Sequence, residues 1–223
     1  MTLQEAQAQI DQILGTYRTR TASGETLLSG ALTPGKVYEA WVLCQVLQRL
    51  HGEEGYDVEL QGAPGVRLKS SPGPINRSYP HFRLTAPGKH PLEVWTDVEF
   101  LSLSASVRGV PPEYAARCDY HELDVVVVPA GTSGRPGPTD VRVGVECKNL
   151  TYRKELLRAL LGVRRELSLL TDATATGFRY WPRDAVPAQP PSCLLAYGTD
   201  PAIGVFSPPG SVFGIDFVHL PLP

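Results

Sequence analysis

Segment 141–149 (VRVGVECKN) places two charged residues that can do chemistry at the end of an apolar run. In a β-strand, alternate side chains point to opposite faces, so the three valines and Cys147 would share one face. The other face would carry Arg142, Gly144, Glu146 and Lys148. Burial of one face explains the valines. It does not explain why a carboxylate stands beside an ammonium group at the strand end.

Segment 121–129 (HELDVVVVP) supplies a second carboxylate, because Asp124 directly precedes four valines that suit a buried strand. A Gly/Pro-rich segment joins the two segments, so we expect them to pair as an antiparallel hairpin. The start of the first strand then lies next to the end of the second. This pairing would bring Asp124 beside Glu146 and Lys148.

Two carboxylates at close range repel each other unless a cation or a proton lies between them. Magnesium binds through one or two carboxylates together with substrate phosphate. A neighbouring lysine can position water or help to deprotonate it, and it can stabilise charge at phosphorus. These are the parts that phosphodiester hydrolysis requires. The alternative is an ordinary surface salt bridge at the end of a hairpin.

Asp124 followed by Glu146-Cys147-Lys148 on the next strand resembles the PD-(D/E)xK (restriction-endonuclease-like) nuclease superfamily. The resemblance implies an α/β fold with a mixed β-sheet flanked by helices, and it covers roughly residues 35–200 in element order. It further implies that Asp124, Glu146 and the Cys147 carbonyl bind Mg²⁺, with Mn²⁺ able to substitute, and that Lys148 serves a metal-activated water. Glu39 matches the glutamate that members often carry on the first core helix, although a helix-start charge is the alternative.

The resemblance implies an endonuclease or exonuclease acting on nucleic acid, with DNA expected ahead of RNA, and a role in phage defence is one expectation. The chain departs from the family pattern in two places. No proline precedes Asp124, and no glutamine occurs between 151 and 171. A second function class is a catalytically inactive module of the same fold that binds nucleic acid or protein.

The predicted helix over about 152–171 carries a basic row that suits contacts to a phosphate backbone. Lys154, Arg158 and Arg165 form this row, flanked by Arg153 and Arg164. The alternative is a solvated helix face on which these residues pair with Glu155 and Glu166.

Three other patterns are weighed against simpler interpretations. Asp97 and Glu99 are candidates for rival or additional metal ligands, but we expect them to be exposed positions of an amphipathic strand. Segment 30–36 (GALTPGK) matches most of a P-loop, yet Val37 stands where magnesium needs a hydroxyl. Cys118 and His121 lack a second ligand pair for zinc, so the four cysteines are expected to be buried free thiols.

The remaining pattern predicts a single domain over residues 1–223, with an N-terminal helix and connection over 1–34 and C-terminal strands over 201–223. The core over 35–200 begins with a buried helix over 35–50 and contains an insertion at about 52–92. Further strands are expected at 57–61, 81–85, 93–104, 193–197, 202–205 and 214–219.

Composition narrows the class of protein. The 223 residues include 42% hydrophobic and 20% charged residues, which favours a globular domain, and the net charge of −2 counts mildly against a surface coated in nucleic acid. No apolar run is long enough to cross a bilayer and the N-terminus does not resemble a signal peptide, so a cytoplasmic location without membrane contact is expected. A homodimer or a partner subunit is compatible with the sequence.

Overall fold

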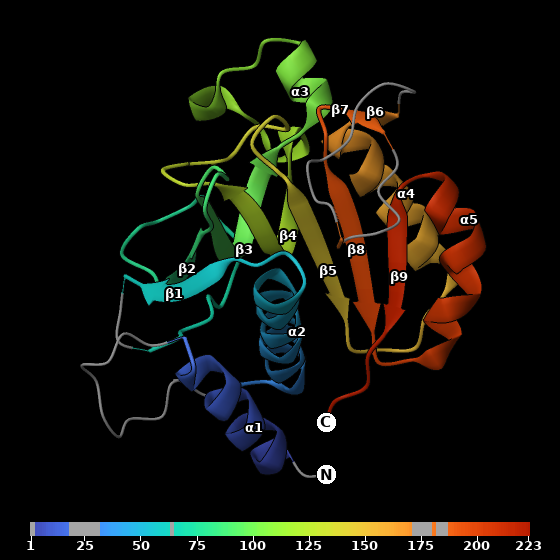
Figure 1. Ribbon diagram of the computed structural model, residues 1–223. Helices are drawn as coiled ribbons and strands as arrows, with labels where there is room; N and C mark the ends of the chain where they lie inside the picture. Colours follow the sequence, from blue (N-terminus) through green and yellow to red (C-terminus); the bar gives the residue numbers. More distant parts are fainter. Residues whose placement is uncertain (1–2, 18–31, 63–64, 171–179, 182–186) are drawn as a thin grey trace.

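The computed structural model describes residues 3–17, 32–62, 65–170, 180–181 and 187–223. It is a mixed α/β structure built around a seven-stranded sheet with strand order β1-β2-β3-β4-β5-β8-β9 (Figure 1). The strands are β1 (Asp57–Gln61), β2 (His81–Thr85), β3 (Leu92–Leu101), β4 (Tyr120–Pro129), β5 (Val143–Lys148), β8 (Cys193–Gly198) and β9 (Ile215–His219). Neighbours from β1 to β5 pair antiparallel, whereas β5, β8 and β9 pair parallel.

Helices cover both faces of this sheet. The helices are α1 (Leu3–Gly15), α2 (Pro34–Gly52), α3 (Leu103–Val107), α4 (Lys154–Leu167) and α5 (Ser207–Val212). Short 3-10 helices η1 (Pro112–Tyr114), η2 (Arg117–Asp119) and η3 (Pro201–Phe206) and a small ribbon of β6 (Leu169–Leu170) and β7 (Ala188–Gln189) complete the described elements. Among the described residues, no helix is long and apolar enough to span a bilayer.

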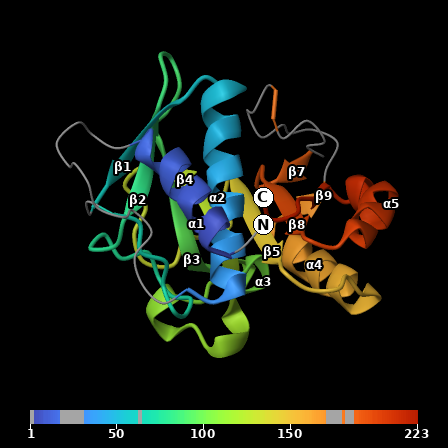
Figure 2. The same cartoon turned by 90° about the horizontal axis from the view of Figure 1, so that it is seen from below.

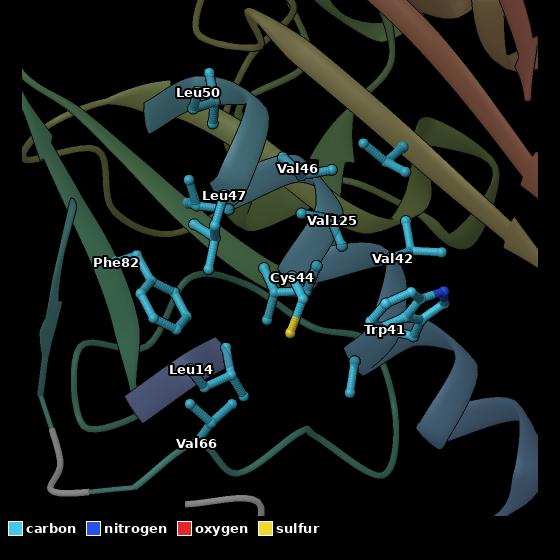
Figure 3. Close-up of a cluster of buried hydrophobic side chains, with 14 of the residues drawn as sticks. Leu14, Trp41, Val42, Cys44, Val46, Leu47, Leu50, Val66, Phe82 and Val125 are labelled. Carbon is cyan, nitrogen blue, oxygen red and sulfur yellow. The ribbon is translucent and has the colours of Figure 1, made fainter. Parts of the chain in front are cut away.

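Helix α2 forms the centre of one core cluster, between α1 and the sheet (Figure 2). Thr33 caps its first turn by accepting a hydrogen bond from the Lys36 amide, and Pro34 occupies a position where no amide donor is needed. Its apolar residues are buried on several sides, so the expectation of a buried helix over 35–50 is confirmed. Figure 3 shows Leu47 of α2 beside Phe82 of β2, and all three of Leu47, Leu50 and Phe82 belong to this cluster.

The second core cluster lies on the opposite face of the sheet. Leu194 and Leu195 are consecutive in β8 yet belong to different clusters, as the alternation of a strand requires. Leu160 and Leu167 of α4 pack on the Leu194 side. The sheet is therefore buried on both faces, and a charged side chain within its central strands needs a compensating partner.

Most expected elements are confirmed within a few residues, and three expectations need correction. Residues 202–205 form part of η3 instead of a strand, because Asp200 caps this turn through the Ala202 amide. The strand expected at 93–104 ends at Leu101, where Ser102 begins α3 by accepting from the Ala105 amide. The helix expected over about 152–171 ends at Leu167, and Leu170 is an exposed residue of β6. Most of the connection expected over 18–35 lies outside the described residues.

Candidate functional site

Three carboxylates form a row across the central strands β3, β4 and β5. In the β3–β4 pairing, Thr96 faces Val125 and Val98 faces Leu123, so Asp97 stands opposite Asp124. In the β4–β5 pairing, Val125 faces Val145, and the next step of this register places Asp124 opposite Glu146. The predicted antiparallel hairpin is thus confirmed. Asp124, however, lies within β4 and not at its start, because the strand begins at Tyr120.

Asp97 is the residue at which β3 reverses its alternation. Its backbone has φ of 52°, a left-handed conformation that few residues other than glycine adopt. Before it, Val94 packs in the cluster with α2 and Trp95 in the opposite one; after it, Val98 belongs to the cluster that contains Trp95. Asp97 is fully buried, so the expectation of an exposed position is wrong. The positive φ of Asp97 turns the side chains that follow it to the opposite face of the sheet. A prediction of burial from strict alternation therefore fails at this residue.

The first turns of α2 add Lys36 and Glu39 to the row. The Lys36 ammonium donates to Glu39 Oε2 and to Asp97 Oδ1. One carboxylate oxygen from each of Glu39, Asp97 and Asp124 lies within 4.8 Å of the others. We call these three residues the acid triad. Oxygen ligands at this spacing suit a hard divalent cation.

Glu146 and Lys148 lie outside the acid triad and form an ion pair of their own. The Lys148 ammonium donates to Glu146 Oε2 at 2.7 Å. Asp124 connects the two groups, because its Oδ2 accepts a hydrogen bond from the Cys147 amide, between Glu146 and Lys148 in the chain. The side chains of Glu146 and Lys148 are only 11% and 25% exposed. The predicted set of Asp124, Glu146 and Lys148 therefore comes together.

Burial raises the pKa values of Glu39, Asp124 and Glu146, and repulsion between neighbouring acids adds to this effect. Burial, with the charge of Asp124 adding to it, raises the pKa of Glu146 to about 7, although Lys148 opposes the shift. Burial also raises the pKa of Glu39 to about 7 against the hydrogen bond from Lys36. The pKa of Asp124 is raised by burial as well. A cation among these groups would favour their charged forms.

The neighbouring acids stabilise the charged forms of Lys36 and Lys148. Burial disfavours their charged forms, but hydrogen bonds and charges from Asp97 and Glu39 raise the pKa of Lys36 above its usual value. Glu146 and Asp124 likewise raise the pKa of Lys148. Both side chains are therefore ammonium ions at neutral pH. Burial keeps the pKa of the Cys147 thiol well above its usual value, which disfavours the thiolate. The part of Cys147 that is a candidate metal ligand is therefore its backbone carbonyl.

The basic row on α4 is exposed at Arg153, Lys154, Arg158 and Arg165. Within the described part of the chain, no ion pair joins these residues to an acid. Glu166 is engaged elsewhere, since it accepts a hydrogen bond from the Ser104 amide.

Arg164 was expected to flank this row and does not. It is buried, and it donates to the Phe213 carbonyl and to the hydroxyls of Ser168 and Ser192. Arg164 therefore ties α4 to the segments before β8 and β9 and has no surface role.

The sequence pattern offered Asp97 as a metal ligand but favoured an exposed position for it, and it missed Lys36 as a member of the site. Lys36 stood out only as the last residue of the P-loop-like segment, of which Gly30 and Ala31 lie outside the described residues. In the structure its ammonium donates hydrogen bonds to Glu39 and Asp97. One signal was available: Lys36 lies one helical turn before Glu39. The expectation of buried thiols holds for Cys44 and Cys193, Cys147 is partly buried, and Cys118 is exposed.

No protein-family model matches this chain, and no curated protein or solved structure matches it either.

Proposed function

We propose that this protein is a Mg²⁺-dependent nuclease of the restriction-endonuclease-like kind that hydrolyses phosphodiester bonds, with DNA ahead of RNA as substrate. The observation that carries this proposal is the meeting of Asp124, Glu146 and Lys148 on adjacent antiparallel strands. A surface salt bridge would explain one acid beside one lysine. It does not explain a row of three buried or half-buried carboxylates across three strands.

The residues fit a magnesium ion. Asp124 and Glu39 already bring carboxylate oxygens together in the acid triad. Glu146, opposite Asp124 on β5, would offer a further carboxylate oxygen, and the Cys147 carbonyl is another candidate ligand. When bound, Mg²⁺ polarises a phosphoryl oxygen and lowers the pKa of a water molecule. The half-buried position of this site limits the water around it and so strengthens each electrostatic contact.

Lys148 would act on the substrate by charge. Its ammonium is held at Glu146 and is itself only partly exposed, so it is oriented before substrate binds. From this place it would donate to a non-bridging phosphate oxygen, whose negative charge grows as the nucleophile attacks phosphorus. Lys154 and Arg158 on the exposed face of α4 would contact phosphates along the strand without reading bases.

Cleavage of supercoiled plasmid and of a single-stranded RNA in Mg²⁺, against the same mixtures in EDTA, tests the proposal. We expect Mg²⁺-dependent cleavage of DNA. Lys148→Ala should lower its rate by about 100-fold or more while the circular dichroism spectrum stays unchanged. Lys89→Ala is the matched control, because Lys89 pairs with Glu54 away from this site and should cut like the parent.

Two results would count against a nuclease. If Lys148→Ala cuts as fast as the parent chain, the assigned residues do not perform the reaction. If the parent binds DNA in Mg²⁺ without any cleavage, the alternative of an inactive binding module is correct.

A further inference from the structure

The acid triad and the Glu146–Lys148 pair contain more negative than positive charge. Among the described residues, the four carboxyl groups of Glu39, Asp97, Asp124 and Glu146 meet three ammonium groups. Lys36 and Lys148 donate to these carboxylates, and Lys69 donates to the backbone carbonyl of Asp97. Glu122 adds to the imbalance, since Asp124 and Asp97 raise the pKa of its carboxyl beyond the effect of burial. A further cation would relieve this repulsion.

Asp97 carries an atom that lacks a partner. Its side chain has no exposed surface, and its Oδ2 makes no hydrogen bond to any described residue. Oδ1 of the same carboxyl accepts a hydrogen bond from Lys36, and one oxygen of this carboxyl lies within 4.8 Å of carboxylate oxygens of Glu39 and Asp124. A buried carboxylate oxygen without a partner is costly, and its persistence at a backbone with positive φ suggests that it serves a ligand.

The Lys36 side chain is placed so that it can move away from the acid triad toward solvent. Its side chain is 22% exposed, whereas that of Asp97 is completely buried. Its backbone amide is fixed by Thr33 at the start of α2, so only the side chain would have to move. A lysine ammonium is strongly hydrated and sits on a flexible stem, which makes it an exchangeable counter-ion.

We propose that the acid triad is a divalent-cation site whose resting occupant is the Lys36 ammonium, so that a metal ion binds there by displacing Lys36 from Glu39 and Asp97. Asp97 then has two roles: it holds Lys36 in the metal-free protein and becomes a ligand in the metal-bound one. The inference deepens the proposed function and rests on it, because it adds a second cation position that shares Asp124 with the hydrolytic one.

The test measures Mn²⁺ binding by the full chain from the loss of the free-ion electron paramagnetic resonance signal. All titrations use a Glu146→Gln background, which disables the Asp124–Glu146 position and makes the readout independent of cleavage. Lys36→Met removes the ammonium and keeps an apolar stem of similar length. We expect it to tighten Mn²⁺ binding by at least about tenfold, because the competing charge is gone. Asp97→Asn should weaken binding by about tenfold or more, and asparagine also tolerates positive φ.

The melting temperature is a second measurement, which shows whether each variant is folded. Without metal, Lys36→Met should melt at a lower temperature than its background, and Mn²⁺ should raise its melting temperature by more than it raises that of the background. In the Asp97→Asn background, Lys36→Met should have a clearly smaller effect on Mn²⁺ affinity, since the two residues act as a pair.

Lys89→Met is the matched control, because it also removes a lysine from a buried carboxylate, Glu54. Lys89 precedes Leu92, which is about 16 Å from Asp97 along β3. This control should leave Mn²⁺ affinity unchanged. Unchanged or weaker binding in Lys36→Met, or equal tightening in Lys89→Met, would overturn the inference. Cleavage by the parent chain is measured separately, so failure here and failure of the proposed function remain distinguishable.

Discussion

Glu39 and Glu146 are residues whose protonation in the fold differs from that in the unfolded chain. The pKa of each is raised from 4.5 to about 7, with burial as the largest cause in both. Between these two values the folded protein holds protons that the unfolded chain has released. Stability in the absence of metal is therefore greatest at low pH within this window and falls as the pH rises through 7.

This linkage predicts a pH-dependent difference between the parent chain and Glu146→Gln. From pH 5.5 to pH 8.5 in EDTA, the parent should lose about 2 kcal/mol of unfolding free energy relative to the variant. Urea denaturation at the two pH values measures this difference. His81, whose pKa is lowered by burial, contributes equally to both proteins and cancels.

Saturating Mg²⁺ should reduce this loss in the parent, because a cation favours the charged carboxylate. A parent that loses no stability relative to Glu146→Gln would show that Glu146 does not titrate near neutrality.

Among the elements, α4 shows which features of a helix its amphipathic pattern predicts and which it does not. Its hydrophobic period correctly predicts Leu160 and Leu167 as buried residues, and its exposed basic row is also as expected. Arg164 differs because its guanidinium donates to the Phe213 carbonyl and the Ser192 hydroxyl, which lie 49 and 28 residues away in the sequence, as well as to the nearby Ser168 hydroxyl. Helical spacing alone cannot reveal such contacts.

The basic row predicts a salt-dependent contribution to DNA binding. Changing Lys154, Arg158 and Arg165 together to glutamine should weaken binding to duplex DNA regardless of sequence. It should also reduce the slope of log affinity against log salt by about 2 to 3. Fluorescence anisotropy across a salt series in Ca²⁺ or EDTA measures both quantities.

A control triple variant changes Arg67, Arg83 and Lys89 to glutamine, which alters the net charge equally at positions outside α4. Equal losses in the two triple variants would assign binding to overall charge and would leave α4 without a specific role.

Much of the site follows from sequence at the level of strands, but its full membership does not. Asp124, Glu146 and Lys148 were recognisable because strand alternation and hairpin order bring them together. Asp97 was expected to be exposed because strict alternation was assumed for β3, whereas its positive φ reverses that alternation. Lys36 escaped because its partner Asp97 lies 61 residues away. Local spacing identifies neighbours within an element, while register and backbone reversal decide neighbours between elements.

The whole molecule is a sheet buried between two helical layers, with the acidic row in its three central strands. This placement gives the carboxylates a rigid frame, since β3 and β4 pair over nearly their full length. A rigid frame suits a site that must hold acids against their repulsion until a cation binds. Because the overall charge is −2, the proposed binding of nucleic acid would depend on a local basic surface.

The most direct test of this account is the anomalous difference map of a crystal soaked in Mn²⁺. We predict a peak within about 2.0–2.4 Å of a carboxylate oxygen of Asp124 and one of Glu146, and the peak at Glu146 should vanish in Glu146→Gln. A map in which manganese binds elsewhere, while both carboxyls keep only protein partners, would contradict the account.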